Sequence, residues 1–234
     1  MPPSYDDILC AVISSLAKRA KELDHEQAVR GIDSLTELQL HALIDDAFTE
    51  SSFGVHREAH YPSDGDAYTK PTHRQRCDFV LTPNPTMKLI DPALELKELA
   101  LAQDTLFAGV AIPERDPAST CPPSDACWVE VKAAAQHAYR DGIPSPNQRY
   151  GLELVNGLQT DLCKLAADPE IWHGCVLAIL FTESEEIAKH DLNQAASICI
   201  DQGLPVRSPI VSCESITERA GNSCVSVGIF AVAI

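Results

Sequence analysis

The spacing of apolar residues changes along this 234-residue chain, and this change constrains the fold more than any other feature. Near the N-terminus apolar side chains recur at helical spacing, so we expect helices at about 4–22 and 34–49. Ser4 suits the N-cap of the first helix, and Ser34 and Glu37 have the spacing of a capping box in the second. From residue 54 the pattern alternates with a period of two, which is typical of strands.

The remaining segments predict a sheet and two further helices. The expected strands are a hairpin near 54–61 and 75–82, a third strand in "CWVEVKA" (127–133), a buried strand in "HGCVLAILFT" (173–182), a final strand in "CVSVGIFAVAI" (224–234) and a candidate short strand in "PIVSCES" (209–215). One helix should begin at Ser145 as N-cap with Pro146 in its first turn, and another should cover 183–202 and end at Gly203. The order α-α-β-β-β-α-β-α-β indicates one α/β domain over 1–234, in which helices flank a mixed sheet.

About 45 residues separate the second and third strands, which is too many for a hairpin turn. This insertion, 83–127, contains seven prolines, and its middle, about 92–107, has a helical composition. The leucines expected on the apolar surface of this helix are Leu94, Leu96, Leu99, Leu101 and Leu106. We predict that this surface docks against the domain as a flap beside the functional site, with a peripheral decoration or an oligomer contact as the alternative.

Composition excludes several classes of protein. The first residues lack the basic start of a signal peptide, and no apolar run approaches the roughly 18 residues that cross a bilayer, so we expect a cytoplasmic protein with no membrane partner. The nine cysteines occur singly and mostly in apolar segments, which indicates core residues and not a disulfide framework. The chain also lacks a G-x-S-x-G elbow, a P-loop and a Rossmann glycine motif.

Three charged residues lie within strands that are otherwise apolar. Glu130 and Lys132, in "ACWVEVKAAAQ", are two positions apart and therefore share a face, and Asp78, in "RQRCDFVL", lies on the strand before. Burying charge is costly, so this placement indicates a function. Two carboxylates at the edge of a sheet can hold Mg²⁺, and a nearby ammonium group can orient a water. An exposed ion pair on an edge strand is the alternative for Glu130 and Lys132.

This arrangement resembles the PD-(D/E)XK nuclease superfamily, whose members have the restriction-endonuclease-like fold. The resemblance rests on Asp78 and on Glu130-Val131-Lys132, in the second and third strands after a helix, and covers about 34–182. It implies a hydrolase that cleaves phosphodiester bonds of nucleic acid, with Mg²⁺ or Mn²⁺ bound by Asp78, Glu130 and the Val131 carbonyl. Lys132 would position the attacking water.

The resemblance adds three candidates around this set. Glu37 lies on the helix before the sheet, where family members often carry a supporting glutamate, although it could simply cap its own helix. Gln136 and Tyr139 in "KAAAQHAY" loosely match the glutamine and tyrosine of branches similar to RecB exonuclease domains, Gln136 as a catalytic candidate and Tyr139 as a nucleic-acid contact. A polar surface residue and a half-buried ring are the alternatives for these two.

The net charge of −16 opposes binding to nucleic acid, because Lys and Arg provide most of the affinity for phosphates. Segment 51–82 is the exception, since it is neutral and carries the candidate nucleic-acid contacts Arg57, Lys70, Arg74 and Arg76, interleaved with His56, His60 and His73. DNA is the expected substrate, and ordinary surface charge is the alternative for this strip. A zinc site at His56, Glu58 and His60 is a further alternative, although the spacing is not that of a helical zinc motif. The rival function is a non-catalytic nuclease-like module that binds a basic protein partner.

Overall fold

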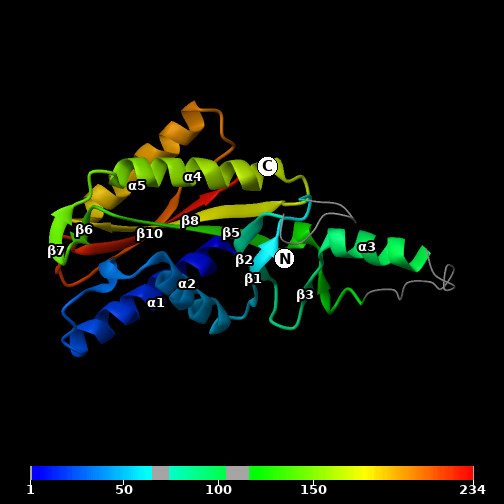
Figure 1. The fold of residues 1–234 in the computed structure, drawn as a ribbon, viewed down its shortest axis with the longest axis horizontal. Coiled ribbons are helices and arrows are strands. Elements are labelled where there is room, and N and C mark those ends of the chain that lie inside the picture. The colour runs from blue at the N-terminus through cyan, green and yellow to red at the C-terminus, as the bar shows by residue number, and fades with distance from the viewer. Residues whose placement is uncertain (1, 65–73, 104–115, 234) are drawn as a thin grey trace.

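The computed structural model of the chain describes residues 2–64, 74–103 and 116–233. A six-stranded sheet is covered by helices on both faces, which confirms the predicted α/β class and mixed sheet (Figure 1). In sheet order the strands are β1 (Gly54–His60), β2 (Arg76–Thr82), β5 (Cys127–Ala135), β8 (His173–Thr182), β10 (Cys224–Ala231) and β9 (Ile210–Ser215). The helices α1 (Tyr5–His25) and α2 (Glu37–Thr49) cover one face, and α4 (Tyr150–Ala167) and α5 (Glu185–Asp201) cover the other.

Strand β5 lies in the middle of the sheet and forms its one parallel pair with β8. It runs parallel to β8, with Glu130 opposite Val176, and α4 connects the two strands. All other neighbours in this sheet are antiparallel. The pairing of β5 with β2 is short, since only the residues 127–129 have partners on β2. The residues of β5 beyond this point are therefore held by β8 alone within the sheet.

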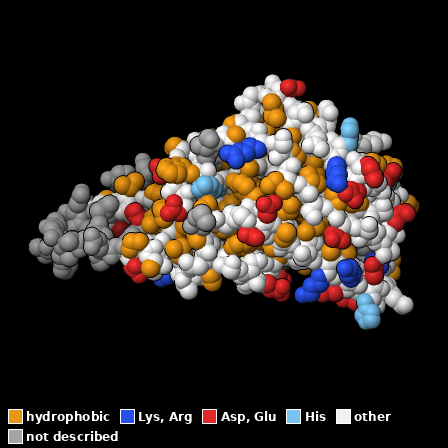
Figure 2. Space-filling model, turned by 180° about the vertical axis from the view of Figure 1, so that it is seen from behind, with side chains coloured by type: hydrophobic (Ala, Val, Ile, Leu, Met, Phe, Trp, Pro, Cys, Tyr) orange, Lys and Arg blue, Asp and Glu red, His pale blue; other side chains and the backbone are white. Residues whose placement is uncertain are grey.

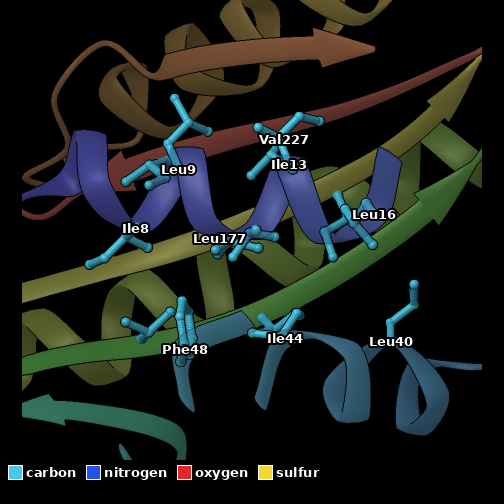
Figure 3. Packing of buried hydrophobic residues seen from close by; sticks show 14 of the residues in the cluster. Ile8, Leu9, Ile13, Leu16, Leu40, Ile44, Phe48, Leu177 and Val227 are labelled. Carbon is cyan, nitrogen blue, oxygen red and sulfur yellow. The ribbon is translucent and has the colours of Figure 1, made fainter. Parts of the chain in front are cut away.

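Each face of the sheet has its own hydrophobic core. Figure 3 shows the core beneath α1 and α2, in which Ile8, Leu16, Ile44 and Phe48 pack toward Leu177 and Val227 of the sheet. On the other face, Leu154, Leu158, Leu162 and Leu165 of α4 pack against Trp128, Val176 and Leu180. These are the stripes that helical spacing predicts. Each fully buried Leu, Ile or Phe side chain stabilises the fold by about 1.5–3 kcal/mol, so the two cores fix the helices on the sheet.

The first two helices begin with side-chain caps. Ser4 accepts a hydrogen bond from the Asp7 amide, which confirms the predicted N-cap of α1. The capping box of α2 is formed by Thr36 and Gln39, so the predicted pair of Ser34 and Glu37 is wrong. Ser34 instead belongs to a 3₁₀ turn, η1 (Ile32–Ser34), where its hydroxyl donates to the Gly31 carbonyl. Glu37 thereby becomes the first residue of the helix and is free to extend from its end.

A short hairpin precedes α4 where the sequence predicted the start of that helix. Strands β6 (His137–Arg140) and β7 (Ile143–Pro146) pair with each other, and Ser145 lies opposite Ala138, so the predicted N-cap at Ser145 is wrong. Asp141 and Gly142 both have positive φ, 52° and 81°, as a two-residue type I′ hairpin turn requires. Helix α4 consequently begins four residues later than expected, at Tyr150.

The insertion forms an appendage at one end of the sheet (Figure 1). It contains two paired short strands, β3 (Lys88–Leu89) and β4 (Thr120–Cys121), the helix α3 (Pro92–Gln103) and a 3₁₀ turn, η3 (Pro123–Asp125). Ala93 is buried, but Leu94 and Leu96 are 49% and 52% exposed, so the predicted docking of these two leucines is wrong. Leu106 and the side chains of Leu99 and Leu101 lie outside the described part of the structure.

All nine cysteines are free, and six of them are buried, which confirms the expected core role for these six. Cys10 and Cys163 are exposed, and Cys213 is half-buried, so the expectation is wrong for Cys10 and Cys163. Within the described ranges, no helix combines the length and hydropathy that a membrane span requires.

Candidate active site

The candidate site lies where β2 and β5 separate. Pairing between them ends at Phe79 and Val129, and immediately beyond it the Asp78 carboxylate accepts a hydrogen bond from the Val131 amide at 2.8 Å. This side chain occupies the place that a strand backbone would otherwise take. Because the N–H and C=O of one residue leave a strand on the same side, the Val131 carbonyl also points toward β2. The separation therefore brings two oxygen donors, from Asp78 and Val131, to the same edge of β5.

A local change of face explains the direction of Asp78. Val55 of β1 and Phe79 of β2 contribute to the core under α1 and α2, whereas Ala59 and Cys77 contribute to the opposite core, although regular alternation would keep them on one face. The change occurs at Glu58, which has a φ of 52° and lies across from Asp78 in the hairpin register. Such backbone strain in a residue other than glycine costs about 1–3 kcal/mol and is typical of functional sites.

Glu130 lies beside this edge with its side chain buried against the α4 face. It is 2% exposed, and the Tyr61 hydroxyl donates to Oε1 at 2.6 Å. The Tyr61 ring stacks on Trp128, with centroids 5.9 Å apart. Burial raises the pKa of Glu130 to about 8, the Tyr61 hydrogen bond opposes this, and the charges of Asp78 and Asp161 add to it. The site therefore favours a neutral Glu130 near pH 7 unless a cation joins it.

Asp161 of α4 holds two lysines above the sheet. It is 1% exposed, with Oδ2 at 2.9 Å from Lys132 Nζ and Oδ1 accepting from Lys164 Nζ at 2.7 Å. Burial lowers the pKa of Lys132, but Asp161, together with Asp78 and Glu37, raises it above its ordinary value. Both ammonium groups thus stay charged. Gly157, one turn before Asp161, leaves room for the lysine, because a Cβ there would lie 3.1 Å from Lys132 Cδ.

Helix α2 contributes Glu37 from the opposite layer. Glu37 Oε1 lies 3.9 Å from Lys132 Nζ and 3.9 Å from His41 Nε2. Its side chain is 57% exposed, so it can move, whereas the His41 ring is buried and packs edge-on against Phe79. Lys132 is therefore flanked by carboxylates from both helical layers, Asp161 on one side and Glu37 on the other.

The oxygen donors at this edge fit a hard divalent cation. Asp78, Glu130 and the Val131 carbonyl offer two carboxylates and one carbonyl, and Mg²⁺ commonly takes one or two carboxylates and keeps several waters. In the ranges that the structure describes, no three Asp, Glu, His or Cys side chains are gathered so that they could hold a metal ion. This includes the alternative set of His56, Glu58 and His60. A cation here would depend on the Val131 carbonyl and on water for its remaining ligands.

Two predicted candidates lie away from this cluster. Gln136 follows the end of β5, where its side-chain oxygen accepts from the Glu183 amide at 2.9 Å. The Tyr139 hydroxyl donates to the Arg219 carbonyl, and the Arg30 guanidinium lies 5.1 Å from the centre of its ring. Both side chains therefore hold loops around the β6–β7 hairpin.

The predicted basic strip is only partly available at the surface. Arg74 is buried and paired with Asp91, so its place in an exposed strip is wrong. Arg57 forms an ion pair with Asp45 at 3.2 Å and lies over the Phe79 ring. Arg76 is exposed, and Lys70 and His73 lie outside the described residues.

Three residues of the cluster were not predicted as site residues: Tyr61, Asp161 and Lys164. Asp161 carried a signal, since it lies seven positions after Leu154 and three after Leu158, within the buried stripe of α4. An acidic residue at a core position of a helix indicates a buried partner. No comparable pattern marks Tyr61, whose contact with Glu130 spans 69 positions of the sequence.

Comparisons with protein-family models, with curated proteins and with solved structures found no significant match to this chain. The assignment of a function therefore depends on the residues gathered between β2, β5, α2 and α4.

Proposed function

We propose that this protein is a metal-dependent phosphodiesterase that cleaves nucleic acid, with DNA as the expected substrate. One observation carries the proposal: Asp78 bonds to the Val131 amide where β2 and β5 separate, its charge contributes to the raised pKa values of both Glu130 and Lys132, and Lys132 is paired with the buried Asp161. Buried charges are retained at such cost mainly when they are paired or functional. The raised pKa of Glu130, caused first by burial, is typical of a carboxylate placed for chemistry or for a cation.

The order of elements supports a restriction-endonuclease-like fold, which we propose for the region from α2 to β8. A helix precedes a β-hairpin, a third strand follows, and a crossover helix leads to a fourth strand that is parallel to the third. Within this order the acidic residue on the second strand and the E-x-K segment on the third are adjacent. The appendage between these strands and the strands β9 and β10 would be additions to that core.

Each residue then has a chemical role. Asp78, Glu130 and the Val131 carbonyl would hold Mg²⁺ or Mn²⁺. When bound, such an ion would offset the negative charge of a phosphoryl oxygen and lower the pKa of a water. The Lys132 ammonium donates hydrogen bonds to the attacking water or to a phosphate oxygen, and its positive charge stabilises the negative charge that develops on the phosphate oxygens. Asp161 keeps this ammonium in place. Glu37, on the α2 side of Lys132, offers a carboxylate that accepts a hydrogen bond from a water.

A cleavage assay tests the proposal. Purified protein is incubated with labelled single- and double-stranded DNA and RNA in Mg²⁺, in Mn²⁺ and in EDTA. We expect cleavage that requires the divalent ion and that Asp78→Asn reduces by at least about a hundredfold, while Asp201→Asn, at the exposed end of α5, has the wild-type rate. A pure and folded preparation that cleaves none of these substrates would overturn the proposal.

A non-catalytic module is the second candidate, and the surface charge favours it. The net charge is −16, and Figure 2 shows acidic side chains spread over the face in view, with fewer basic side chains among them. Such a surface would repel free nucleic acid but would suit a basic protein partner. Calorimetric titration with Mn²⁺ separates the two candidates. The enzyme should bind Mn²⁺ and lose the signal in Asp78→Asn, whereas a scaffold should bind none.

A further inference from the structure

Arg74 is buried, which is unusual for an arginine, and it contacts Tyr61, the residue that bonds to Glu130 of the candidate site. Its side chain is 3% exposed. The Nη1 atom donates to both carboxylate oxygens of Asp91, at 3.0 and 2.7 Å, and Nη2 donates to the Tyr61 carbonyl at 2.8 Å. The Nε atom donates to the Asp64 carbonyl at 2.5 Å. This fork therefore binds two separate segments of the chain, the turn at 61–64 and the residue before α3, to one guanidinium group.

Asp91 connects the guanidinium to the insertion. Besides its ion pair, Asp91 Oδ1 accepts hydrogen bonds from the Ala93 and Leu94 amides, at 3.0 and 3.4 Å, in the first turn of α3. A carboxylate at this position satisfies amides that the helix leaves unpaired. The start of α3 is consequently bound to Arg74 through a single side chain.

Tyr61 connects the guanidinium to Glu130. Its carbonyl accepts from Arg74, while its hydroxyl donates to Glu130 Oε1 at 2.6 Å. Its ring stacks on Trp128, and the indole Nε1 of Trp128 donates to the Pro123 carbonyl of η3 at 3.0 Å. The insertion is thus tied to the Tyr61–Trp128 pair from both sides, at Pro123 by the hydrogen bond from Trp128 and at Asp91 through Arg74.

We propose that Arg74 and Tyr61 are positioning residues, through which the insertion fixes the Glu130 carboxylate for the divalent cation. The proposal rests on the proposed function, because it assumes that Glu130 binds a metal ion. It assigns the insertion a role in building the site, in addition to any effect on access to it. Residues that orient a metal ligand from behind typically change metal affinity by roughly 10- to 100-fold when they are mutated.

Mn²⁺ binding, measured from the electron paramagnetic resonance signal of free Mn²⁺, tests this role. Arg74→Lys keeps the charge but loses the fork, and we expect Mn²⁺ to bind about tenfold more weakly. Asp91→Asn is a milder change that keeps the cap of α3, and it should weaken binding in the same direction. Glu98→Gln, at an exposed position of α3, is the matched control and should bind as the wild type does. Circular dichroism melts establish that each variant is folded.

A double-mutant cycle tests whether Arg74 acts through Tyr61. Tyr61→Phe removes the hydroxyl that contacts Glu130 but keeps the ring on Trp128. If Arg74 acts through Tyr61, the variant carrying both Arg74→Lys and Tyr61→Phe should bind Mn²⁺ no more weakly than Tyr61→Phe alone. Losses that multiply, or unchanged binding in both Arg74→Lys and Asp91→Asn, would overturn this inference and leave the proposed function intact. An absence of Mn²⁺ binding in the unmodified protein would overturn both.

Discussion

The Lys132 ammonium lies 2.9 Å from Asp161 Oδ2, and this ion pair joins the third strand of the candidate site to the crossover helix α4. Asp161 is almost fully buried, while Lys132 and Lys164 retain about a third of their side-chain exposure. The buried carboxylate, which is shielded from water, therefore depends more on these ion pairs than the two partly exposed ammonium groups do. In this arrangement a helix that the fold requires for the parallel β5–β8 connection also determines where the ammonium lies.

Removal of the Asp161 charge should affect both stability and activity. Asp161→Asn leaves two ammonium groups close together without the negative charge that they share, and we expect the free energy of unfolding to fall by about 1–3 kcal/mol, less than for a fully buried pair because both lysines are partly exposed. Cleavage should fall further than stability explains, since Lys132 loses its fixed position. Guanidinium unfolding and single-turnover rates measure the two effects, with Asp201→Asn as the control. An unchanged cleavage rate in folded Asp161→Asn would argue against a role for the pair.

Gly157 offers a test of Lys132 that leaves every charge in place. An alanine there would place Cβ 3.1 Å from Lys132 Cδ, so the lysine must shift, while alanine in a helix is favoured over glycine by up to about 1 kcal/mol. We expect Gly157→Ala to keep near-wild-type stability and to reduce the cleavage rate by roughly tenfold. Gly151→Ala on the same helix is the matched control, because its Cβ would meet nothing within 4 Å. Equal rates in the two variants would mean that the position of Lys132 does not matter.

The pKa of Glu130 predicts how stability depends on pH in the absence of divalent ions. Its folded value of about 8 exceeds the ordinary value of 4.5, so the folded state holds a proton that the unfolded state has released. The stabilising contribution of this group is therefore complete below about pH 4.5 and is lost as the pH rises toward 8, by about 1–3 kcal/mol. Glu130→Gln cannot ionise and keeps an acceptor for Tyr61.

Denaturant unfolding in EDTA between pH 5 and pH 9 checks this dependence on pH. The difference in unfolding free energy between Glu130→Gln and the wild type should grow in favour of the variant as the pH rises. Groups that do not interact with Glu130 titrate equally in both proteins and cancel in the difference. A difference that stays constant over this range would show that Glu130 has no raised pKa.

Most of the fold could be predicted because it is encoded locally. The apolar stripes of α1 and α4 have helical spacing, and β8 is a continuous apolar run, so each pattern is visible within a short stretch of sequence. The errors arose where two local signals compete. Ser145 and Pro146 suit a helix start, but Asp141-Gly142 favours a hairpin turn. The hairpin forms, and Ser145 of β7 pairs with Ala138 of β6 and does not cap the helix.

The candidate site was only partly predictable, because its contacts join distant parts of the chain. Asp78, Glu130 and Lys132 could be found as charges within apolar strands, and Val131 followed from them. The ion pair of Arg74 with Asp91 and the hydrogen bond of Tyr61 to Glu130 depend on where the hairpin and the insertion meet. No pattern of residue spacing in the sequence predicts this contact between the hairpin and the insertion. Arg74 therefore resembled a surface residue until its buried partners were known.

The most direct test of the site is the rate at which Lys132→Ala cleaves a labelled single-stranded DNA in Mn²⁺ under single-turnover conditions. Lys189→Ala, which removes an exposed lysine of α5, serves as the control. The site described above predicts that Lys132→Ala binds Mn²⁺, remains folded and cleaves at least about a hundredfold more slowly than the control, because the variant lacks the ammonium that we propose contacts the reacting groups. Cleavage by Lys132→Ala at the rate of the control would contradict it.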